Sequence, residues 1–408
     1  MRDQRKSDLL PVAEALARVL ADAKSLPVEL AKLDDALGRV LTEDLKARRT
    51  QPPADVSAMD GYAVRGACAT SAPVTLAVVG EVAAGHPFGG TVGQDQAARI
   101  FTGGVLPDGS DTVVIQEMTA RDGDKVTVKK TTAKGRNVRR SGIDFSEGQT
   151  LLASGRRLTA RDLMLAAAMN YPALPVHRRA KVAVLGTGDE LVPPGATPAP
   201  GQIVYSNGFA LRALAQEEGA DTIDLGVAGD TTAAIAAAVR KALDAGADVL
   251  VTTGGASVGE HDLVRDALAA EGLSLSFWKV AMRPGRPMMH GRLADMQVLG
   301  LPGNPVSSYV CAFLFLVPLI RRLSGRPDAG LARSDAVLGC DLPENDERED
   351  YLRATLQDSP TGIVAVPLPV QDSSLMAGLA KADCLVIRPP HAPAAAAGSH
   401  CVILKLAL

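Results

Sequence analysis

The chain has 408 residues, which is too long for a single hydrophobic core and predicts about two to four domains. Its 47% apolar and 22% charged residues are typical of a globular protein and exclude wholesale disorder. The net charge of −3 argues against nucleic acid as the main partner, because binding to a phosphate backbone requires a basic surface.

The cysteines and the apolar segments indicate the cellular compartment in which the protein is expected to work. Five cysteines are widely spaced without a C-x-x-C pair, which disfavours a disulfide scaffold and a structural zinc site and favours a reducing cytoplasm. Glu14 and Arg18 interrupt the N-terminal apolar residues, as in an amphipathic helix rather than a signal peptide. The most apolar run, residues 309–320, is shorter than the roughly 20 residues that span a bilayer, so we predict a buried helix and no membrane partner.

The first part of the chain predicts a helix followed by a β-rich region. Residues 8–24 carry apolar side chains at helical spacing, and a polar, proline-containing break follows at 48–53. From about 55 to 140, short alternating stretches are separated by Gly, Pro and Asp turns, which is typical of a β-rich domain. Residues 141–177 return to a strand and a helix, and we expect them to pack with residues 25–47 as one discontinuous unit.

Residues 178–324 alternate strands with helices, which implies βαβ units and right-handed crossovers. Helices are predicted to begin at Ser206, at Asp230 as an N-cap, and at Asn304 followed by Pro305. Four apolar strands are expected at residues 181–185, 222–228, 248–251 and 297–299. Beyond this region short strands and turns return, so a small all-β domain is predicted at the C-terminus.

Glycines follow each of these four strands closely, and acidic residues follow the first three. Strands of an open parallel sheet end together and ligands bind at their carboxyl edge, so the four loops are expected to form one pocket. The expected carboxylates are those of Asp189, Glu190, Asp230, Glu260 and Asp262. Clustered carboxylates require a cation, and Mg²⁺ binds through one or two of them together with phosphates and water. Taken singly, Asp230 is equally well explained as a helix cap, and the Asp189–Glu190 pair as a solvated loop.

Two further loops suggest anion binding. Thr252-Thr-Gly-Gly255 is either an anion nest of backbone N–H groups or a tight turn, and the following Ser257, Gly259, Glu260 and Asp262 favour function. Lys279, Arg283 and Arg286 surround a Pro-Gly turn, which is either a solvated basic loop or an anion-capture loop. Gly303 and Asn304 at a helix start add an anion site assisted by the helix dipole.

Seven motifs follow one another in an order that covers nearly the whole chain. They are Ser57-Ala-Met-Asp-Gly-Tyr-Ala63, Phe101-Thr-Gly-Gly104, Arg139-Arg-x-Gly-x-Asp144, Thr187-Gly-Asp-Glu-Leu191, Gly254-Gly-x-Ser-Val-Gly-Glu-x-Asp262, Lys279-Val-x-x-x-Pro-Gly285 and Gly300-Leu-Pro-Gly-Asn-Pro-Val-Ser307. This series closely resembles the MoeA family, the molybdopterin molybdenumtransferases, to which the E domain of gephyrin is related. Chance does not readily produce so many motifs in one order.

The resemblance implies a multidomain α/β and β fold around a central three-layer, MogA-like α/β domain. Its implied regions are a discontinuous elongated domain (1–47 and 141–177), an inserted β-rich domain (48–140), the molybdopterin-binding α/β domain (178–326) and a C-terminal β-barrel (327–408). It also implies a homodimer whose active cleft takes residues from both subunits, with Asp60 and Asp144 facing the partner. Molybdopterin adenylyltransferase and cofactor-accepting enzymes are further partners that the resemblance suggests.

The activity that the resemblance implies is insertion of molybdenum from molybdate into adenylyl-molybdopterin, with Mg²⁺, releasing AMP. The implied catalytic residues are Asp60, Asp144, Glu190, Asp230 and Asp262, of which Glu190, Asp230 and Asp262 are also the implied Mg²⁺ ligands. The implied binding residues are Thr187, Gly188, Asp189, Thr253, Gly254, Gly255, Ser257, Gly259, Lys279, Arg283, Arg286, Pro302, Gly303, Asn304, Arg353, Ser373 and Ser374. Glu260 is assigned no catalytic role.

Two other functions are compatible with parts of this pattern. A molybdopterin adenylyltransferase shares the α/β domain, but such enzymes are usually small single-domain chains, so the flanking β-rich regions disfavour it. A non-catalytic dimeric scaffold is disfavoured by the retained acids. Within the family pattern, Arg283 and Arg286 stand where Lys is usual, and Asp372 stands where Gly is common. Arg keeps the positive charge of Lys but presents its hydrogen-bond donors in a different geometry. The choice between molybdate and tungstate stays open.

Overall fold

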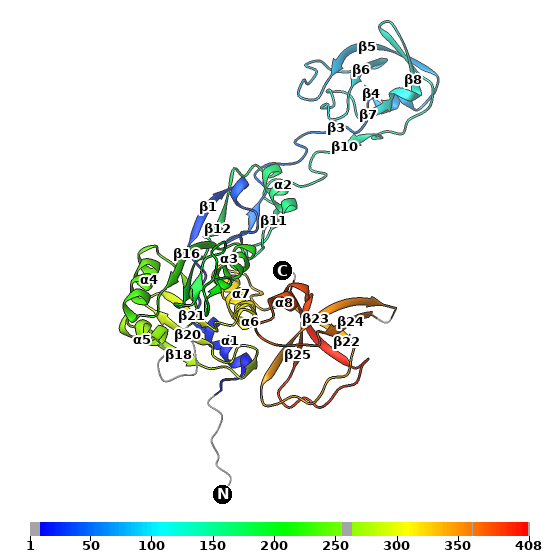
Figure 1. The fold of residues 1–408 in the computed structure, drawn as a ribbon. Helices are drawn as coiled ribbons and strands as arrows, with labels where there is room; N and C mark the ends of the chain where they lie inside the picture. The colour runs from blue at the N-terminus through cyan, green and yellow to red at the C-terminus, as the bar shows by residue number, and fades with distance from the viewer. Residues whose placement is uncertain (1–8, 255–262, 361, 407–408) are drawn as a thin grey trace.

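The computed structural model describes residues 9–254, 263–360 and 362–406. The molecule is elongated: an α/β body lies beside a C-terminal barrel, and a narrow stalk carries a β-rich distal domain away from both (Figure 1). The predicted multidomain α/β and β fold is thereby confirmed.

The distal domain is a six-stranded sheet with the strand order β7-β4-β6-β5-β9-β8. Its strands are β4 (Gly61–Val64), β5 (Val74–Val82), β6 (Gln96–Ile100), β7 (Thr112–Ile115), β8 (Thr119–Asp122) and β9 (Lys125–Val128). Buried β-branched residues build two apolar cores, one around Val114 and one around Ile100. Two chain segments join this domain to the stalk, and they pair with each other as β3 (Val56–Ser57) and β10 (Val138–Arg139).

The stalk is built from two segments that lie far apart in the sequence. Strand β1 (Val28–Lys32) pairs antiparallel with β12 (Ala173–His177), and β2 (Leu45–Lys46) pairs with β11 (Thr150–Leu152). Helix α2 (Ala160–Ala168) contributes to the same apolar core. The polypeptide therefore leaves this unit, forms the distal domain and returns to complete it.

The α/β body contains a six-stranded sheet with the order β16-β13-β17-β21-β20-β18. The strands are β13 (Lys181–Thr187), β16 (Asp221–Ala228), β17 (Val249–Thr253), β18 (Ser274–Trp278), β20 (Met289–Leu293) and β21 (Met296–Leu301). The four strands predicted from the sequence are β13, β16, β17 and β21, and they are mutually parallel. Strand β20 is antiparallel to its neighbours, so β18 again runs in the direction of β21.

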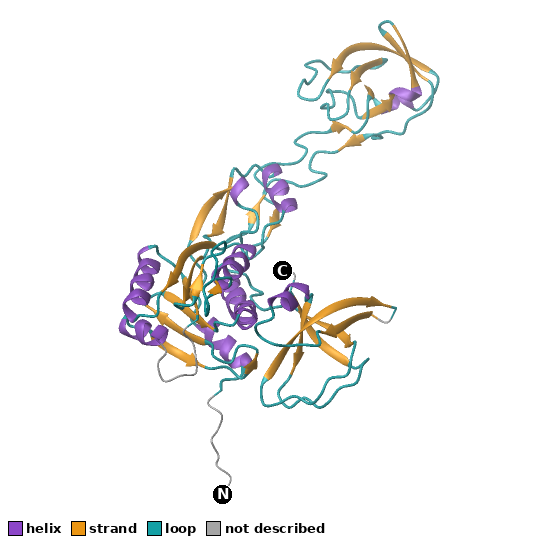
Figure 2. Ribbon diagram, in the orientation of Figure 1, coloured by secondary structure: helices purple, strands orange, loops and turns teal. Residues whose placement is uncertain are grey.

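Helices cover both faces of this sheet and make three layers (Figure 2). One face packs against α4 (Thr232–Asp244) and α5 (Leu263–Ala270). The other face packs against α3 (Asn207–Glu217), against the helix that starts at Pro305, and against α1 (Val12–Ala21). Because both faces are buried, the strands are continuously apolar rather than alternating.

The long helix after β21 is the centre of the larger core. It consists of α6 (Pro305–Cys311), a π-helical turn (Ala312–Leu316) and α7 (Val317–Leu323). The stretch Pro305–Leu323 is apolar and long enough to cross a membrane by length and composition, but 89% of its most apolar window is buried inside the protein. The buried helix predicted over residues 309–320 is confirmed, and its hydrophobicity reflects the packing of the body.

The C-terminal region is a closed β-barrel, as predicted. Five strands close it in the order β23-β24-β22-β26-β25 and back to β23. They are β22 (Arg333–Leu338), β23 (Glu349–Ser359), β24 (Gly362–Pro367), β25 (Cys384–Arg388) and β26 (His400–Lys405), and helix α8 (Met376–Lys381) lies between β24 and β25. A two-residue strand of the α/β body, β19 (Met282–Arg283), pairs in parallel with β23.

A buried ion cluster joins the end of α3 to the end of α7. The Glu218 side chain is 1% exposed, and it accepts hydrogen bonds from Arg321 Nε at 2.9 Å, from Arg321 Nη2 at 2.5 Å and from Arg326 Nη1 at 3.0 Å. Arg321 Nη1 also donates to the carbonyl of Gly330 at 3.0 Å. Two guanidinium groups therefore share one carboxylate at the junction where the chain leaves the body for the barrel.

A second ionic network secures β19 to the barrel and makes stability depend on pH. Hydrogen bonds from Arg348, at 2.7 Å from Nη2 and 2.9 Å from the backbone N–H, lower the pKa of Asp346 from 3.8 to about 2. Arg283 Nη1 lies 3.4 Å from the same carboxylate. Because the folded pKa is depressed, the stabilisation is present above pH 3.8 and is lost as the pH falls toward 2.

We therefore expect the urea midpoint of the wild-type protein to fall between pH 3.8 and pH 2 by more than that of Asp346→Asn. The variant lacks the carboxylate whose protonation produces this part of the loss. Equal pH dependence of the two proteins over that window would contradict the assignment.

Candidate active site at the carboxyl edge of the sheet

The parallel strands end together, as the sequence predicts. Strand pairing places Thr187 beside Ala228, Gly186 beside Thr253, and Thr253 beside Leu301. These residues are the last or next-to-last of their strands, so the loops that follow them start from one edge. The Lys279 loop starts at the same edge, because β18 has the direction of β21.

A cavity of about 660 Å³ lies among these loops. It is lined by eight of the predicted residues, namely Thr187, Glu190, Thr253, Gly254, Pro302, Gly303, Asn304 and Ser374. We call it the first cavity. Its lining also includes residues to which the sequence analysis assigned no binding role, namely Leu191, Ile203, Val204, Tyr205, Ser206, Asn207, Pro287, Pro305 and Met376. Ser374 and Met376 belong to the barrel region, so the cavity is shared between body and barrel.

The acidic residues meet at this edge through backbone contacts. Asp230 N donates to Asp189 Oδ1 at 3.0 Å, and Asp189 N donates to Asp230 Oδ2 at 3.3 Å. The Glu190 carboxylate lies over Gly188, where an added Cβ would come within 2.5 Å of Glu190 Oε2. All three acidic side chains are exposed to solvent, and all their donor atoms are oxygens.

The predicted helix cap at Asp230 is wrong. Helix α4 begins at Thr232, and Thr231 is the cap, because its hydroxyl accepts a hydrogen bond from Ala234 N at 3.2 Å. Thr231 has the extended backbone of a cap, so its own hydroxyl, rather than the preceding carboxylate, faces the first turn. Asp230 is therefore left for the reciprocal contact with Asp189.

The side chains at two other helix starts also serve the site instead of capping. Asn304 precedes α6 without a capping bond, and its Nδ2 donates to Ser373 Oγ at 2.9 Å. Asn207, the first residue of α3, donates through Nδ2 to Thr253 Oγ1 and to the carbonyl of Gly303, both at 2.8 Å. Asn207 thus joins the loops after β17 and β21, and the sequence reasoning missed it.

Gly254 fixes the closest approach of two loops. Its φ is +95°, and an added Cβ would lie 2.3 Å from the backbone oxygen of Thr187. The neighbouring strand cannot move away, because Gly186 and Thr253 pair within the sheet. Only glycine satisfies both the backbone conformation and this contact.

We expect Gly254→Ala to weaken ligand binding and to lower stability by about 1–3 kcal/mol, since both strain and a backbone clash are introduced. Urea unfolding and ligand titration measure the two effects. Gly246→Ala is the matched control, because Gly246 also has positive φ (+67°) but has open space around its Cβ position. Equal behaviour of the two variants would show that the clash is unimportant.

The three predicted anion-binding cations have different surroundings. Arg283 Nε donates to Asp350 Oδ1 at 2.8 Å, so its charge is paired on β19, and it is absent from the cavity lining. Lys279 has a positive φ of 83°, and its Nζ lies 4.4 Å from the centre of the Trp278 ring. Arg286 is exposed and has no acidic partner among the described residues.

The barrel brings Arg353 and the Ser373–Ser374 loop toward the site. Arg353 is 1% exposed, and its Nη2 donates to the carbonyl of Asp372 at 3.1 Å. Desolvation by burial lowers the pKa of this guanidinium. The Ser373 carbonyl accepts from Val306 N at 3.1 Å, which attaches the barrel loop to the start of α6.

Several predicted residues lie elsewhere. Asp60 lies between β3 and β4, Asp144 lies between β10 and β11, and neither lines the first cavity of the same chain. Figure 1 shows β3, β4 and β10 far from the α/β body. Hydrogen bonds from Thr102 N (2.7 Å) and Thr102 Oγ1 (2.8 Å) lower the pKa of Asp60. The predicted residues Gly255, Ser257, Gly259 and Asp262, together with Glu260, lie outside the described residues.

Family models match the chain along almost its full length. They are the MoeA N-terminal region (domain I and II) over residues 10–170, a "Probable molybdopterin binding domain" over 183–322 and the MoeA C-terminal region (domain IV) over 335–406. A relative from Mycobacterium tuberculosis, molybdopterin molybdenumtransferase 2, is 36% identical over 92% of this chain and 94% of its own length. The chain belongs to the MoeA family.

Other MoeA proteins agree with this assignment. The molybdopterin molybdenumtransferase of Haemophilus influenzae is 34% identical over 88% of this chain and 89% of its own. Two crystal structures of MoeA proteins from Pyrococcus horikoshii superpose with TM-scores of 0.83 and 0.80, at 32% and 27% identity, and each covers 97% of this chain. The likeness to the MoeA fold therefore extends over body, stalk, distal domain and barrel.

Proposed function

We propose that this MoeA family member is a molybdopterin molybdenumtransferase that inserts molybdenum from molybdate into adenylyl-molybdopterin, with Mg²⁺, and releases AMP. The observation that carries the proposal is the first cavity, where glycine loops, a carboxylate and the barrel hydroxyl of Ser374 meet in the region that matches the "Probable molybdopterin binding domain". The five free cysteines fit work in a reducing cytoplasm.

The phosphates of the ligand are assigned to the glycine loops. Gly254 and Gly303 approach each other closely, since a Cβ on Gly303 would lie 3.6 Å from the Gly254 Cα. Neither residue has a side chain, so backbone N–H groups are accessible to an anion, and the long helix that starts at Pro305 adds a favourable dipole. Asn207 holds the two loops together and thereby preorganises them.

The donor set fits Mg²⁺ as an ion that also takes ligands from phosphate and water. Glu190 and Asp230 would hold it, with Asp262 as a further predicted ligand, and all of these donors are hard oxygens. Among the described residues, which do not include Asp262, no three His, Cys, Asp or Glu side chains converge as a preformed metal cage. Bound Mg²⁺ would neutralise negative charge as the phosphoanhydride breaks.

Molybdate is a dianion and requires positive charge and hydrogen-bond donors. Lys279 and Arg286 are the available cations of the basic loop, whereas Arg283 is paired with Asp350. Arg353 and the hydroxyls of Ser373 and Ser374 would supply donors from the barrel, and Ser374 Oγ would then exchange the bond that it donates to Asp372 Oδ1 at 2.6 Å. We therefore assign molybdate to the junction of body and barrel, beside the first cavity.

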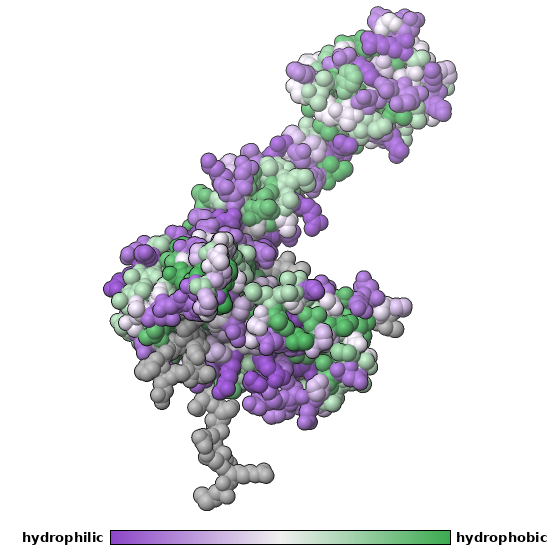
Figure 3. Space-filling model, in the orientation of Figure 1, coloured by the Kyte–Doolittle hydropathy of each residue, from purple (hydrophilic) through white to green (hydrophobic). Residues whose placement is uncertain are grey.

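A homodimer would complete the site with Asp60 and Asp144 of a second copy. Apolar side chains are exposed on the stalk (Figure 3): Val28 is 59%, Leu30 75%, Leu37 57% and Met164 72% exposed. Such a group of exposed apolar residues is typical of an interface.

Mixing Asp60→Asn with Glu190→Gln protein should then restore part of the activity that each variant lacks alone, because a mixed dimer contains one site with neither substitution. Absence of restoration would contradict a shared site.

The decisive test is AMP release from adenylyl-molybdopterin. We expect release only when both molybdate and Mg²⁺ are present, with one molybdenum retained on the pterin product by mass measurement. Formation of adenylyl-molybdopterin from molybdopterin and Mg-ATP would instead identify an adenylyltransferase. Absence of either reaction, with intact dimer formation, would favour a scaffold.

A further inference from the structure

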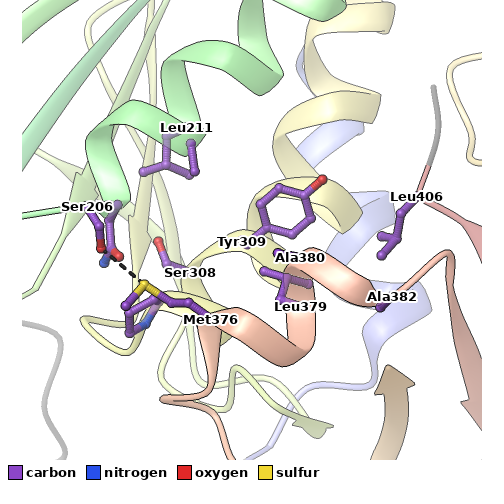
Figure 4. Close-up of a pocket in the computed structure, with 12 residues that line it drawn as sticks. Ser206, Leu211, Ser308, Tyr309, Met376, Leu379, Ala380, Ala382 and Leu406 are labelled. Atoms are coloured by element: carbon purple, nitrogen blue, oxygen red, sulfur yellow. Dashed lines mark hydrogen bonds between the residues drawn. The ribbon is translucent and has the colours of Figure 1, made fainter. Parts of the chain in front are cut away.

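A second cavity of about 400 Å³ lies between the body and the barrel (Figure 4). Helices α3 and α6 of the body form one wall, and α8 and the end of β26 form the other. Its apolar lining includes Leu211, Tyr309, Leu379 and Leu406. Among the described residues that line it, none carries a charge, so the cavity is unsuited to a phosphate or a metal ion.

The second cavity adjoins the first cavity. Both are lined by Ser206, Asn207, Pro305 and Met376. Ser206 Oγ donates to Met376 Sδ at 3.5 Å, so these two side chains meet where the cavities join (Figure 4). The methionine is 49% exposed, and its three rotatable bonds allow it to fold over a ligand that passes between the cavities.

The chemistry of the second cavity fits a flat ring rather than a flexible chain. Tyr309 is held parallel to Phe313, with 6.4 Å between ring centres and an interplanar angle of 7°. Leu211 and Leu379 supply apolar surface near it, while Ser206, Asn207 and Ser308 supply polar atoms. A heterocycle has apolar faces and polar edges, which is the combination that this lining can satisfy.

We propose that the second cavity is the pterin subsite, which takes the ring system of the ligand whose phosphate lies in the first cavity. The inference rests on the proposed function. That ligand has two ring systems, the pterin and the adenine, and the position of the barrel residues indicates which of them lies in the second cavity. Molybdenum must reach the sulfur atoms carried by the pterin, and the assigned molybdate donors Ser373 and Ser374 directly precede α8 in the chain. The ring beside α8 is therefore the pterin, and the adenine lies elsewhere.

The test fills the second cavity from one face of α8. Met376, Leu379 and Ala380 line it at helical spacing, whereas Ala377, three residues before Ala380, is absent from the lining. We compare Ala380→Trp with Ala377→Trp, so that the same substitution is made one turn apart. Hydroxymethylpterin phosphate, followed by its own fluorescence, reports pterin binding, and AMP with Mg²⁺, followed by calorimetry, reports nucleotide binding.

We expect Ala380→Trp to weaken binding of hydroxymethylpterin phosphate by about tenfold or more, because the indole occupies the space of the ring. Its AMP affinity and the behaviour of Ala377→Trp should match wild type. If Ala380→Trp does not fold, Ala210→Trp on the α3 wall gives the same comparison.

Three results would overturn the assignment. Unchanged pterin binding in the filled variant would show that the ring lies elsewhere. Loss of AMP binding alone would place adenine in the second cavity, and equal loss in Ala377→Trp would show that the position is irrelevant. A wild-type protein that binds neither probe would refute the proposed function itself, which distinguishes that failure from failure of the subsite.

Discussion

Replacing Glu190 by Gln is expected to lower the rate of AMP release by about 100-fold or more. Loss of a residue that only hydrogen-bonds to a metal ligand typically costs about 10–100-fold, and the loss of a metal ligand itself should cost more. Glutamine keeps the size of the side chain that lies over Gly188, so the loop should retain its shape. What is lost is the negative charge that the proposal assigns to Mg²⁺ binding. We therefore expect the Mg²⁺ concentration needed for half-maximal rate to rise.

The matched control is Asp221→Asn. Asp221 is also an exposed acid of the same sheet, but it begins β16 at the opposite, amino edge. This variant should retain the wild-type rate and Mg²⁺ dependence. Full activity of Glu190→Gln would show that its carboxylate is dispensable, and the assignment of the first cavity as the metal-dependent centre would fail.

Replacing Glu218 by Gln is expected to reduce the free energy of unfolding by about 3–5 kcal/mol. Its carboxylate is almost fully buried and is the shared partner of Arg321 and Arg326. An amide of the same size leaves the buried Arg321 guanidinium without a counter-ion and leaves Arg326 with only the exposed Asp328, 3.6 Å away, so the desolvation of Arg321 is no longer compensated. Urea unfolding can be followed by fluorescence of Trp278, the single tryptophan of the chain.

The control for this prediction is an ion pair at the surface. Glu14 and Arg18 are one helical turn apart on α1, with side chains 50% and 45% exposed. Glu14→Gln should cost only about 0.3–0.5 kcal/mol, as for other exposed pairs on a helix. A loss below about 1 kcal/mol for Glu218→Gln would show that the buried cluster is readily replaced.

The sequence predicted the layout of the site because its signals are local. An apolar run that ends in Gly or Asp marks the carboxyl end of a buried strand, and this located the loops after Thr187 and Thr253. Asn207 was missed because nothing in its neighbourhood distinguishes a helix start from a contact with residues 46 positions away. Arg283 was assigned to anion capture because its partner Asp350 lies 67 positions further on.

The roles of Asp60 and Asp144 came only from the family resemblance. Asp60 stands in a turn among apolar neighbours, Asp144 ends a stretch that equally fits a salt-bridged surface strand, and neither lines the first cavity within one chain. Met376 was missed for a related reason: its position over the junction of two cavities depends on how the barrel docks. Packing between domains leaves little trace in the local sequence, because the pattern of apolar residues mainly reflects burial within each domain's own core.

The pairing of β19 with β23 has a mechanical consequence. Residues Met282 and Arg283 are part of the loop between Lys279 and Arg286, yet they are hydrogen-bonded into the barrel wall. Any rotation of the barrel must therefore move that basic loop together with the barrel. The barrel and the basic loop of the α/β body are mechanically coupled. A ligand that draws the barrel toward the body therefore also repositions the positive charges of Lys279 and Arg286.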